Sequence, residues 1–295
     1  MEDDPATGLV SGDPQRTTAV LEGLLDTARS SGDAEGEALL LERIAHARFR
    51  LGDLRASDEF FRQAAERAEA AHEGNVTARC LQGRADVALA RGDANDAERY
   101  YDEAAGRMAA LGDQRGALAC EVGIARCLAD EGRTEEAESR FTDCLERALR
   151  LDERGVAGDC HAFLGEIADE LGDTVAAVEA YWDALELARV SGDRTRQANN
   201  EGRMAGALVQ LGRYCEAAEH AVRALEGHGS LGAADLQALD LWNLGDALTG
   251  LEHPHEARAA FEAALALYRS VGAFAQAEAV AEQLAAMDAG ESGVG

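Results

Sequence analysis

The sequence predicts an all-α solenoid, in which antiparallel helix pairs repeat every 40 residues along the chain. Glycine recurs at this period inside tripeptides such as Leu51-Gly52-Asp53, in the series Gly52, Gly92, Gly132, Gly172 and Gly212. A second series lies halfway between these positions, at Gly32, Gly112, Gly192, Gly232 and Gly272. Turns about every 20 residues leave one helix between successive turns, and only 3 prolines occur in the 295 residues.

Residues spaced 40 apart also share their size, which is the second observation behind the prediction. The large column holds Ile44, Arg84, Ile124, Leu164, Met204 and Leu244, and the small column after it holds Ala45, Ala85, Ala125, Gly165, Ala205 and Gly245. A small column starting at Ser57, an aromatic column starting at Phe61 and an alanine column starting at Ala64 follow on one helical face. Small residues at 45 and 57 would let two helices approach closely, with the ring at 61 between them.

The helices follow in order from these turns. First helices are expected near 35–50, 75–90, 115–130, 155–170, 195–210 and 235–250, each followed by a second helix. A lone second helix at Thr17 to Ala28 and a first helix at Phe274 to Met287 would cap the two ends, as open stacks require. The aspartate after a turn glycine, such as Asp93 or Asp173, is expected to accept hydrogen bonds from the next helix. We expect one domain over 15–288, a disordered acidic segment at 1–14 and a disordered tail at 289–295.

These columns resemble the tetratricopeptide repeat, a unit of about 34 residues with two antiparallel helices. The segment Gly212-Arg213-Tyr214-Cys215-Glu216-Ala217 matches that family's entry into the second helix almost literally. Here the terminal proline is absent and each unit is longer, so the chain looks like the 40-residue variety of kinesin light chains and spindle-orientation scaffolds. The resemblance implies a right-handed superhelical α-solenoid of six repeats with capping helices at both ends.

The charge of the chain excludes some partners. There are 56 acidic and 28 basic residues, every basic residue is arginine, and the net charge is −28. Such a surface repels nucleic-acid phosphates and anionic lipid headgroups. It is also typical of halophilic proteins, since molar salt shortens the Debye length to roughly 3 Å and screens self-repulsion. GC-rich codon usage could also remove lysine, but it does not explain the excess of carboxylates.

The six cysteines and the N-terminus predict a reduced, cytoplasmic protein. No signal peptide is recognisable between Met1 and Pro14, and no run of 18 apolar residues is present. Cys80, Cys120 and Cys160 share one column, where equivalent helices roughly 8 to 10 Å apart are too distant for a direct disulfide. We therefore expect core or half-buried thiols.

The resemblance also implies a ligand groove, because first helices of that family line the inner face. Its contact positions correspond to the columns that start at Leu39, Glu42, His46, Phe49 and Arg50, and these columns are mainly acidic. The predicted groove residues are His46, Arg79, Asp86, Arg126, Asp159, Glu166, Asp169, Asn199, Trp242, Asn243 and Asp246. A cationic or mixed-charge peptide fits such a groove, with exposed Trp242 as a stacking anchor. Alternatively, the carboxylates are simply hydrated and Trp242 is packed by the last helix.

No motif predicts catalysis, a metal or another cofactor. Gly227 to Gly232 matches a dinucleotide fingerprint, but a helix precedes it where a strand is needed, so we interpret it as a turn. Glu252 to Glu256 offers carboxylates and imidazoles at one exposed turn, a weak metal candidate. The main hypothesis is a non-catalytic scaffold that binds a peptide or helical segment, as a monomer or weak dimer. The alternative is a peptide-responsive sensor that controls a partner through a conformational change.

Overall fold

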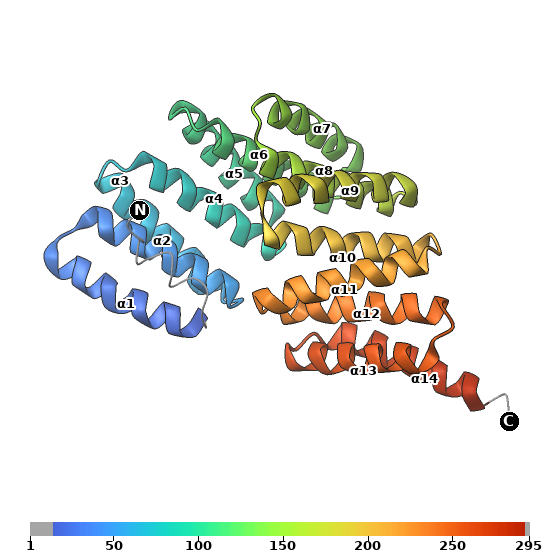
Figure 1. Ribbon diagram of the computed structural model, residues 1–295. Coiled ribbons are helices and arrows are strands. Elements are labelled where there is room, and N and C mark those ends of the chain that lie inside the picture. Colours follow the sequence, from blue (N-terminus) through green and yellow to red (C-terminus); the bar gives the residue numbers. More distant parts are fainter. Residues whose placement is uncertain (1–13, 293–295) are drawn as a thin grey trace. The chain divides into compact units, whose positions relative to one another are not determined.

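The computed structural model of the protein describes residues 14–292, and these residues form fourteen α-helices (Figure 1). The first helices of the pairs are α2 (Ala34–Arg50), α4 (Gly74–Ala90), α6 (Gln114–Asp130), α8 (Arg154–Glu170), α10 (Arg194–Gln210) and α12 (Ala234–Gly250). The second helices are α3 (Leu54–Ala70), α5 (Ala94–Ala110), α7 (Thr134–Arg150), α9 (Thr174–Ser191), α11 (Tyr214–Leu231) and α13 (Pro254–Ser270). The capping helices are α1 (Pro14–Ser31) and α14 (Phe274–Ser292). The predicted solenoid of consecutive helix pairs is confirmed.

The chain divides into two compact units. Unit 1 is Met1–Cys144 and unit 2 is Leu145–Gly295, with the boundary inside α7. The right-handed superhelix and the single domain over 15–288 stay predictions. Of the predicted disordered segments, residues 1–13 and 293–295 lie outside the described residues, while α14 continues as far as Ser292.

The turns between helices all use the left-handed backbone conformation. The ten glycines of the two sequence series have φ between 69° and 82°. The remaining turns place His72, Asp152 and Glu252 in this region, with φ of 63°, 56° and 60°. The left-handed conformation has a steric cost for any residue with a side chain. These three turns therefore keep that conformation without glycine, the residue that adopts it most easily.

Aspartates after the turns start several helices, as predicted. The Oδ1 atom of Asp173 accepts from the backbone N–H of Ala176 at 3.1 Å, and equivalent bonds cap α2, α3, α6 and α10. The prediction for Asp93 is wrong. Asp93 makes no such bond, and its carboxylate lies 3.5 Å from the guanidinium of Arg91 instead.

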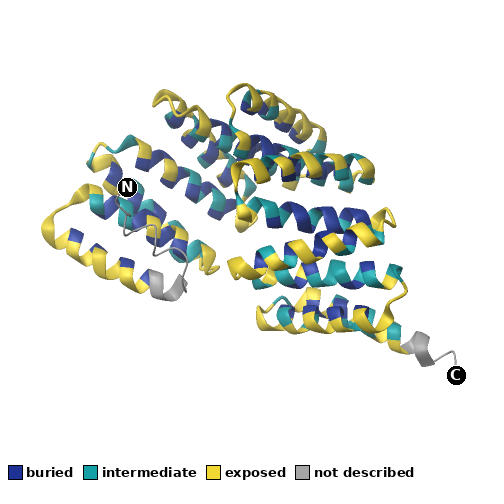
Figure 2. Ribbon diagram, in the orientation of Figure 1, coloured by how far each residue is buried: buried dark blue, intermediate teal, exposed yellow. Residues whose placement is uncertain are grey.

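The close helix contact predicted from the small columns is present. Ser57 is buried and its hydroxyl donates to the carbonyl of Ala45 at 2.9 Å. A Cβ atom on Gly165 would lie 2.6 Å from a ring carbon of Tyr181, so the ring packs directly on the glycine backbone. Buried faces therefore follow the inner side of each helix pair, and the turns stay exposed (Figure 2).

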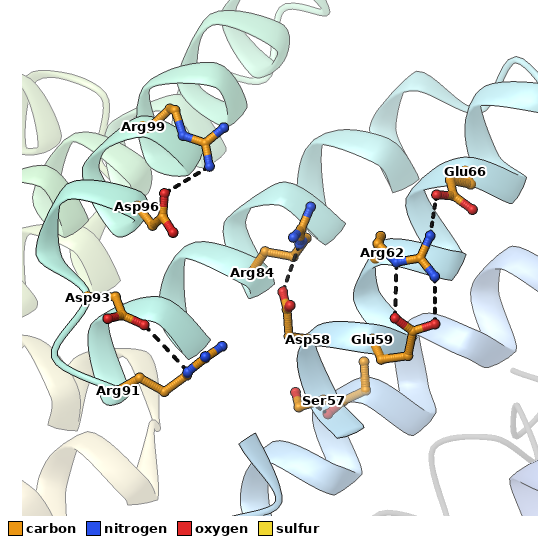
Figure 3. A network of polar contacts seen from close by, with 11 residues as sticks. Ser57, Asp58, Glu59, Arg62, Glu66, Arg84, Arg91, Asp93, Asp96 and Arg99 are labelled. Carbon is orange, nitrogen blue, oxygen red and sulfur yellow. Dashed lines mark hydrogen bonds and ion pairs between the residues drawn. The ribbon is translucent and has the colours of Figure 1, made fainter. Parts of the chain in front are cut away.

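Arg84 is the charged member of the large column, and its neighbours explain how it is accommodated. Its side chain is half-buried and donates to Asp58 of α3 at 2.8 Å (Figure 3). Its guanidinium also lies 4.3 Å from the ring centroid of Tyr100, and Arg99 lies at 4.5 Å from the same ring. Arg84 thus combines an ion pair with stacking, which suits arginine and not lysine.

The cysteines are mostly buried, as predicted. No disulfide links the six, all of which lie in the described residues, and only Cys215 is exposed. Burial raises the pKa of Cys80 and Cys120 to about 12. No described helix combines the length and apolarity that crossing a membrane requires.

Candidate functional site

Four of the predicted groove residues lie in unit 1, where each is engaged with a neighbour. Arg79 makes two hydrogen bonds of 2.7 Å to the buried carboxylate of Glu42. The hydroxyl of Tyr101 donates to Asp86 at 2.5 Å. Burial raises the pKa of Asp86, while Tyr101, Arg126 and His46 oppose that change. The His46 ring meets Phe61 edge-on, with 4.9 Å between centroids.

Unit 2 holds a groove of about 460 Å³ over α10, between α8 and α12. Four predicted residues line it together, namely Glu166, Asp169, Asn199 and Asn243. The other lining residues are Tyr181, Gly202, Arg203, Gly206, Ala207, Gln210, His228, Leu236, Leu239 and Asp240. First helices thus supply most of the lining, as predicted, and Tyr181 and His228 reach it from second helices. We call this the unit-2 groove.

Arginines neutralise several of the acids that made the predicted groove acidic. Arg196 makes two hydrogen bonds of 2.7 Å to Asp159, and Arg203 lies 2.6 Å from Glu166. In both pairs, as in Glu42 with Arg79, the arginine follows the acid by 37 residues. This spacing of 37 residues is one repeat minus about one helical turn. The arginine therefore lies on the next first helix, about one turn closer to its N-terminus than the position equivalent to the acid. The spacing is visible in the sequence, and it identifies Arg196 and Arg203, which the sequence analysis missed.

A buried polar chain lies at one end of the unit-2 groove. Nδ1 of His228 lies 2.6 Å from Oδ2 of Asp240, and its Nε2 lies 2.9 Å from Oδ1 of Asn199. Only 2% of His228 and 1% of Asp240 are exposed. Burial raises the pKa of Asp240, and the hydrogen bond with His228 opposes this. Gly202 makes room for the pair, because a Cβ there would lie 2.9 Å from Oδ1 of Asp240.

Another part of the lining is amide and apolar. Nδ2 of Asn243 donates to the carbonyl of Gly202 at 3.3 Å. Gly206 is half-buried beside it, and a Cβ there would meet the Asn243 amide at an ordinary contact distance of 3.7 Å. Leu236 is half-buried and Leu239 is exposed, so α12 offers apolar surface to the groove.

Trp242 and Asp246 lie on α12 but do not line the unit-2 groove. Trp242 is half-buried instead of exposed, since it packs on the last helices and meets Tyr268 edge-on at 6.3 Å. Asp246 accepts from Gln283 at 3.2 Å. The alternative in which Trp242 packs against the end of the chain agrees with this placement.

Among the described residues, no group of three metal-ligating side chains converges on one point. At the turn noted as a metal candidate, Nδ1 of His253 lies 3.9 Å from Glu256. The glycine-rich segment Gly227 to Gly232 forms the end of α11 and its left-handed cap.

Two segments of the chain match the tetratricopeptide repeat. Family models of this repeat match residues 36–110, which cover α2 to α5, and residues 241–271, which lie in α12, α13 and the turn after it. No curated protein matches the sequence significantly. The assignment to the 40-residue variety stays a prediction.

Solved structures share the fold at low sequence identity. The crystal structure of a Rap protein complexed with competence and sporulation factor has a TM-score of 0.64 at 14% identity, covering 98% of this chain and 88% of that one. The Rap conjugation gene regulator of plasmid pLS20, in complex with the Phr* peptide, has a TM-score of 0.65 at 14% identity, covering 90% and 78%. The apo quorum sensor NprR from B. thuringiensis has a TM-score of 0.60 at 14% identity, covering 92% and 83%.

Proposed function

We propose that the chain is a non-catalytic peptide-binding repeat protein and that the unit-2 groove holds a short extended segment of its partner. The observation that supports this proposal is which atoms of the two asparagine side chains in the groove are already hydrogen-bonded. Asn199 uses its oxygen on His228, and Asn243 uses its nitrogen on the backbone of Gly202. Within the described residues, the Nδ2 group of Asn199 and the Oδ1 atom of Asn243 make no hydrogen bond, so a donor and an acceptor, the two groups that pair with a peptide unit, are left for a ligand.

The dimensions of the groove support the same partner. Asn199 and Gln210 mark its extent along α10, and eleven residues of α-helix rise about 16 Å. An extended chain rises about 3.3 Å per residue, so about five residues span this distance. Leu236 and Leu239 provide apolar surface for a side chain at the end near Asn199. Main-chain pairing with one apolar contact is the usual basis of recognition for extended peptides.

The test is a selection of random eight-residue peptides, displayed on their own messenger RNA, against the full-length chain. Gly206→Leu fills the groove without a clash at Cβ, and the matched control Gly206→Ala adds one methyl group at a contact of ordinary length. Enriched peptides should bind the wild type and Gly206→Ala, and bind Gly206→Leu at least about tenfold more weakly in fluorescence anisotropy. Circular dichroism verifies that both variants keep their helices. Peptides that bind all three proteins equally would place recognition elsewhere and contradict the proposal.

A sensor that responds to the peptide is the second candidate, favoured by the division of the chain into two compact units. Its fold is also shared by a Rap protein complexed with competence and sporulation factor, by a Rap regulator in complex with the Phr* peptide and by a quorum sensor. In this case an enriched peptide changes the radius of gyration measured by X-ray scattering. An unchanged radius at saturating peptide supports a passive scaffold.

The setting of the protein belongs to the same proposal. We infer a cytoplasm rich in salt from the net charge of −28 and the absence of lysine, and a monomer or weak dimer. The partner is cationic or of mixed charge, because an anionic surface favours such a ligand.

A further inference from the structure

Two tyrosines of the aromatic column differ in what their hydroxyl groups contact. In unit 1, the hydroxyl of Tyr101 donates to Asp86 at 2.5 Å. Tyr181 stands 80 residues later in the same column, and only 3% of it is exposed. In the described part of the chain, no group forms a hydrogen bond with the Tyr181 hydroxyl, although Asp169 and Glu166 influence it electrostatically. Tyr181 also lines the unit-2 groove.

The difference follows from two substitutions between the repeats, aspartate to glutamate and glycine to arginine. Glu166 stands 80 residues after Asp86 and is the matching acid, but Arg203 holds it at 2.6 Å. The position in unit 1 that corresponds to Arg203 is Gly123, which has no side chain. Arg203 therefore withdraws the acid that the tyrosine would otherwise use. Tyr181 lines the groove, and its hydroxyl makes no hydrogen bond within the described residues, so the hydroxyl is left for a partner outside the chain.

The end of the unit-2 groove at Tyr181 also carries negative charge, on Asp169, that no described cation neutralises. Asp169 accepts from Gln210 through Oδ2 at 3.2 Å, and its Oδ1 is buried without a hydrogen-bond donor. Among the described residues, no arginine or histidine pairs with Asp169, whereas Arg203 neutralises Glu166. Asp169 and Gln210 lie in the last turns of α8 and α10, where backbone carbonyls add partial negative charge.

We propose that this end of the unit-2 groove, at Tyr181 and Asp169, binds a cationic group of the ligand, an ammonium or a guanidinium. The Tyr181 hydroxyl accepts one of its N–H groups, and Asp169 supplies the opposite charge. The proposal rests on the proposed function, since the cation belongs to the bound peptide.

The register of the repeat also sets where an apolar side chain of that peptide lies. Leu239 corresponds to residue 159 in the register of α8, ten residues before Asp169. Ten helical residues rise about 15 Å, which an extended chain covers with four to five residues. The ligand should therefore carry its cation and an apolar side chain about four residues apart.

The test compares matched forms of the peptides enriched on the wild-type chain. One form keeps its cationic residue, one has citrulline at that residue, and one has an acetylated N-terminus. Citrulline should weaken binding to the wild type about tenfold or more, as expected for loss of a hydrogen bond to a charged group. Asp169→Asn should abolish this difference and Tyr181→Phe should reduce it. An effect of acetylation in place of citrulline would assign the cation to the N-terminal ammonium.

Tyr101→Phe is the matched control, because it removes a hydroxyl from the same column outside the unit-2 groove. Phenylalanine fits this column, since Phe61, Phe141 and Phe261 occupy it and are buried. Two results would overturn the cationic subsite and leave the proposed groove unaffected. Either the enriched peptides carry no cationic group, or the ratio of the affinities of the arginine and citrulline peptides is the same for wild type and Asp169→Asn. Failure of every peptide to bind the wild type overturns both proposals.

Discussion

Three buried glutamates of first helices, Glu37, Glu42 and Glu201, are held by arginine, and the sequence contains no lysine. Glu201 of α10 is the most connected of them, with Arg189 at 3.1 Å, Arg223 at 3.1 Å and Nδ1 of His220 at 2.5 Å. Glu37 of α2 is similarly placed between Arg29 and Arg67. For Glu201 and Glu37, a first helix supplies the acid, and second helices from two successive pairs supply the cations. Removing the acid leaves those cations without their shared partner.

We predict that Glu201 contributes stability that acid removes. Burial raises its pKa, but hydrogen bonds from His220 and Arg223 outweigh this, so the pKa lies below the ordinary 4.5. The folded state therefore binds fewer protons than the unfolded state, and the contribution is complete above pH 4.5 and lost as pH falls through the folded pKa. Glu201→Gln should lower the free energy of unfolding in urea by about 1–3 kcal/mol at pH 7. The difference from wild type should shrink below pH 4.5.

The matched control is Glu219→Gln, which removes an exposed acid 3.7 Å from Arg223 and should cost under about 1 kcal/mol. A loss for Glu201→Gln that stays constant from pH 7 into the acid range would contradict the assignment.

At this scale the sequence predicted part of the site. Glu166, Asp169, Asn199 and Asn243 were predicted because they occupy columns that correspond to the ligand-contact positions of the family that the sequence resembles, and all four line the unit-2 groove. Tyr181, His228 and Asp240 were not, since each is buried and the periodic pattern assigns such positions to the core. What distinguishes them is hydrogen bonding across different helices, which no spacing within one helix records.

At the scale of elements, the helix boundaries were predictable because the left-handed turn fixes them. Each predicted first helix starts within a residue of the observed one, as the glycine and the helix after it are a constant distance apart. The capping helices α1 and α14 extend beyond their predicted outer ends, because the two glycine series begin at Gly32 and end at Gly272 and so mark no boundary there. Asp93 shows the limit of the pattern, because a nearby arginine takes the carboxylate that would cap the helix.

We predict that glycine stabilises the three turns that lack it. His72→Gly, Asp152→Gly and Glu252→Gly each relieve a left-handed conformation that costs roughly 1–2 kcal/mol for a residue with a side chain, offset in part by greater unfolded-state entropy. Each should raise the free energy of unfolding by about 0.5–1 kcal/mol in urea titrations. Gly92→Ala is the control and should act in the opposite direction. Destabilisation by all three glycines would show that their side chains contribute more than the strain.

At the scale of the whole molecule, the sequence predicted the surface charge but not the division of the chain into two compact units. Composition predicts a strongly anionic surface, and few charged side chains of the described residues are buried. The division between Cys144 and Leu145 was not predicted, because it falls within α7, where no glycine or proline marks a boundary.

We predict that salt stabilises the full chain. Self-repulsion at a net charge of −28 opposes compaction, and raising KCl from 0.1 to 2 M shortens the Debye length from about 10 Å to below 3 Å. The thermal unfolding midpoint should rise by several degrees or more over this range, as measured by circular dichroism. Sucrose at matched osmolality is the control, because it favours burial without screening charge. A midpoint that rises no more in KCl than in sucrose would count against halophilic adaptation.

The rate at which each cysteine is alkylated can report local opening of the protein, because buried cysteines lie in both units. An alkylating reagent should reach Cys215 first, because the other five thiols are buried. Cys80, Cys120, Cys127 and Cys144 belong to unit 1, and Cys160 is the buried thiol of unit 2. Pulsed alkylation followed by peptide mass mapping therefore distinguishes transient opening of one unit from that of the other, without any engineered label.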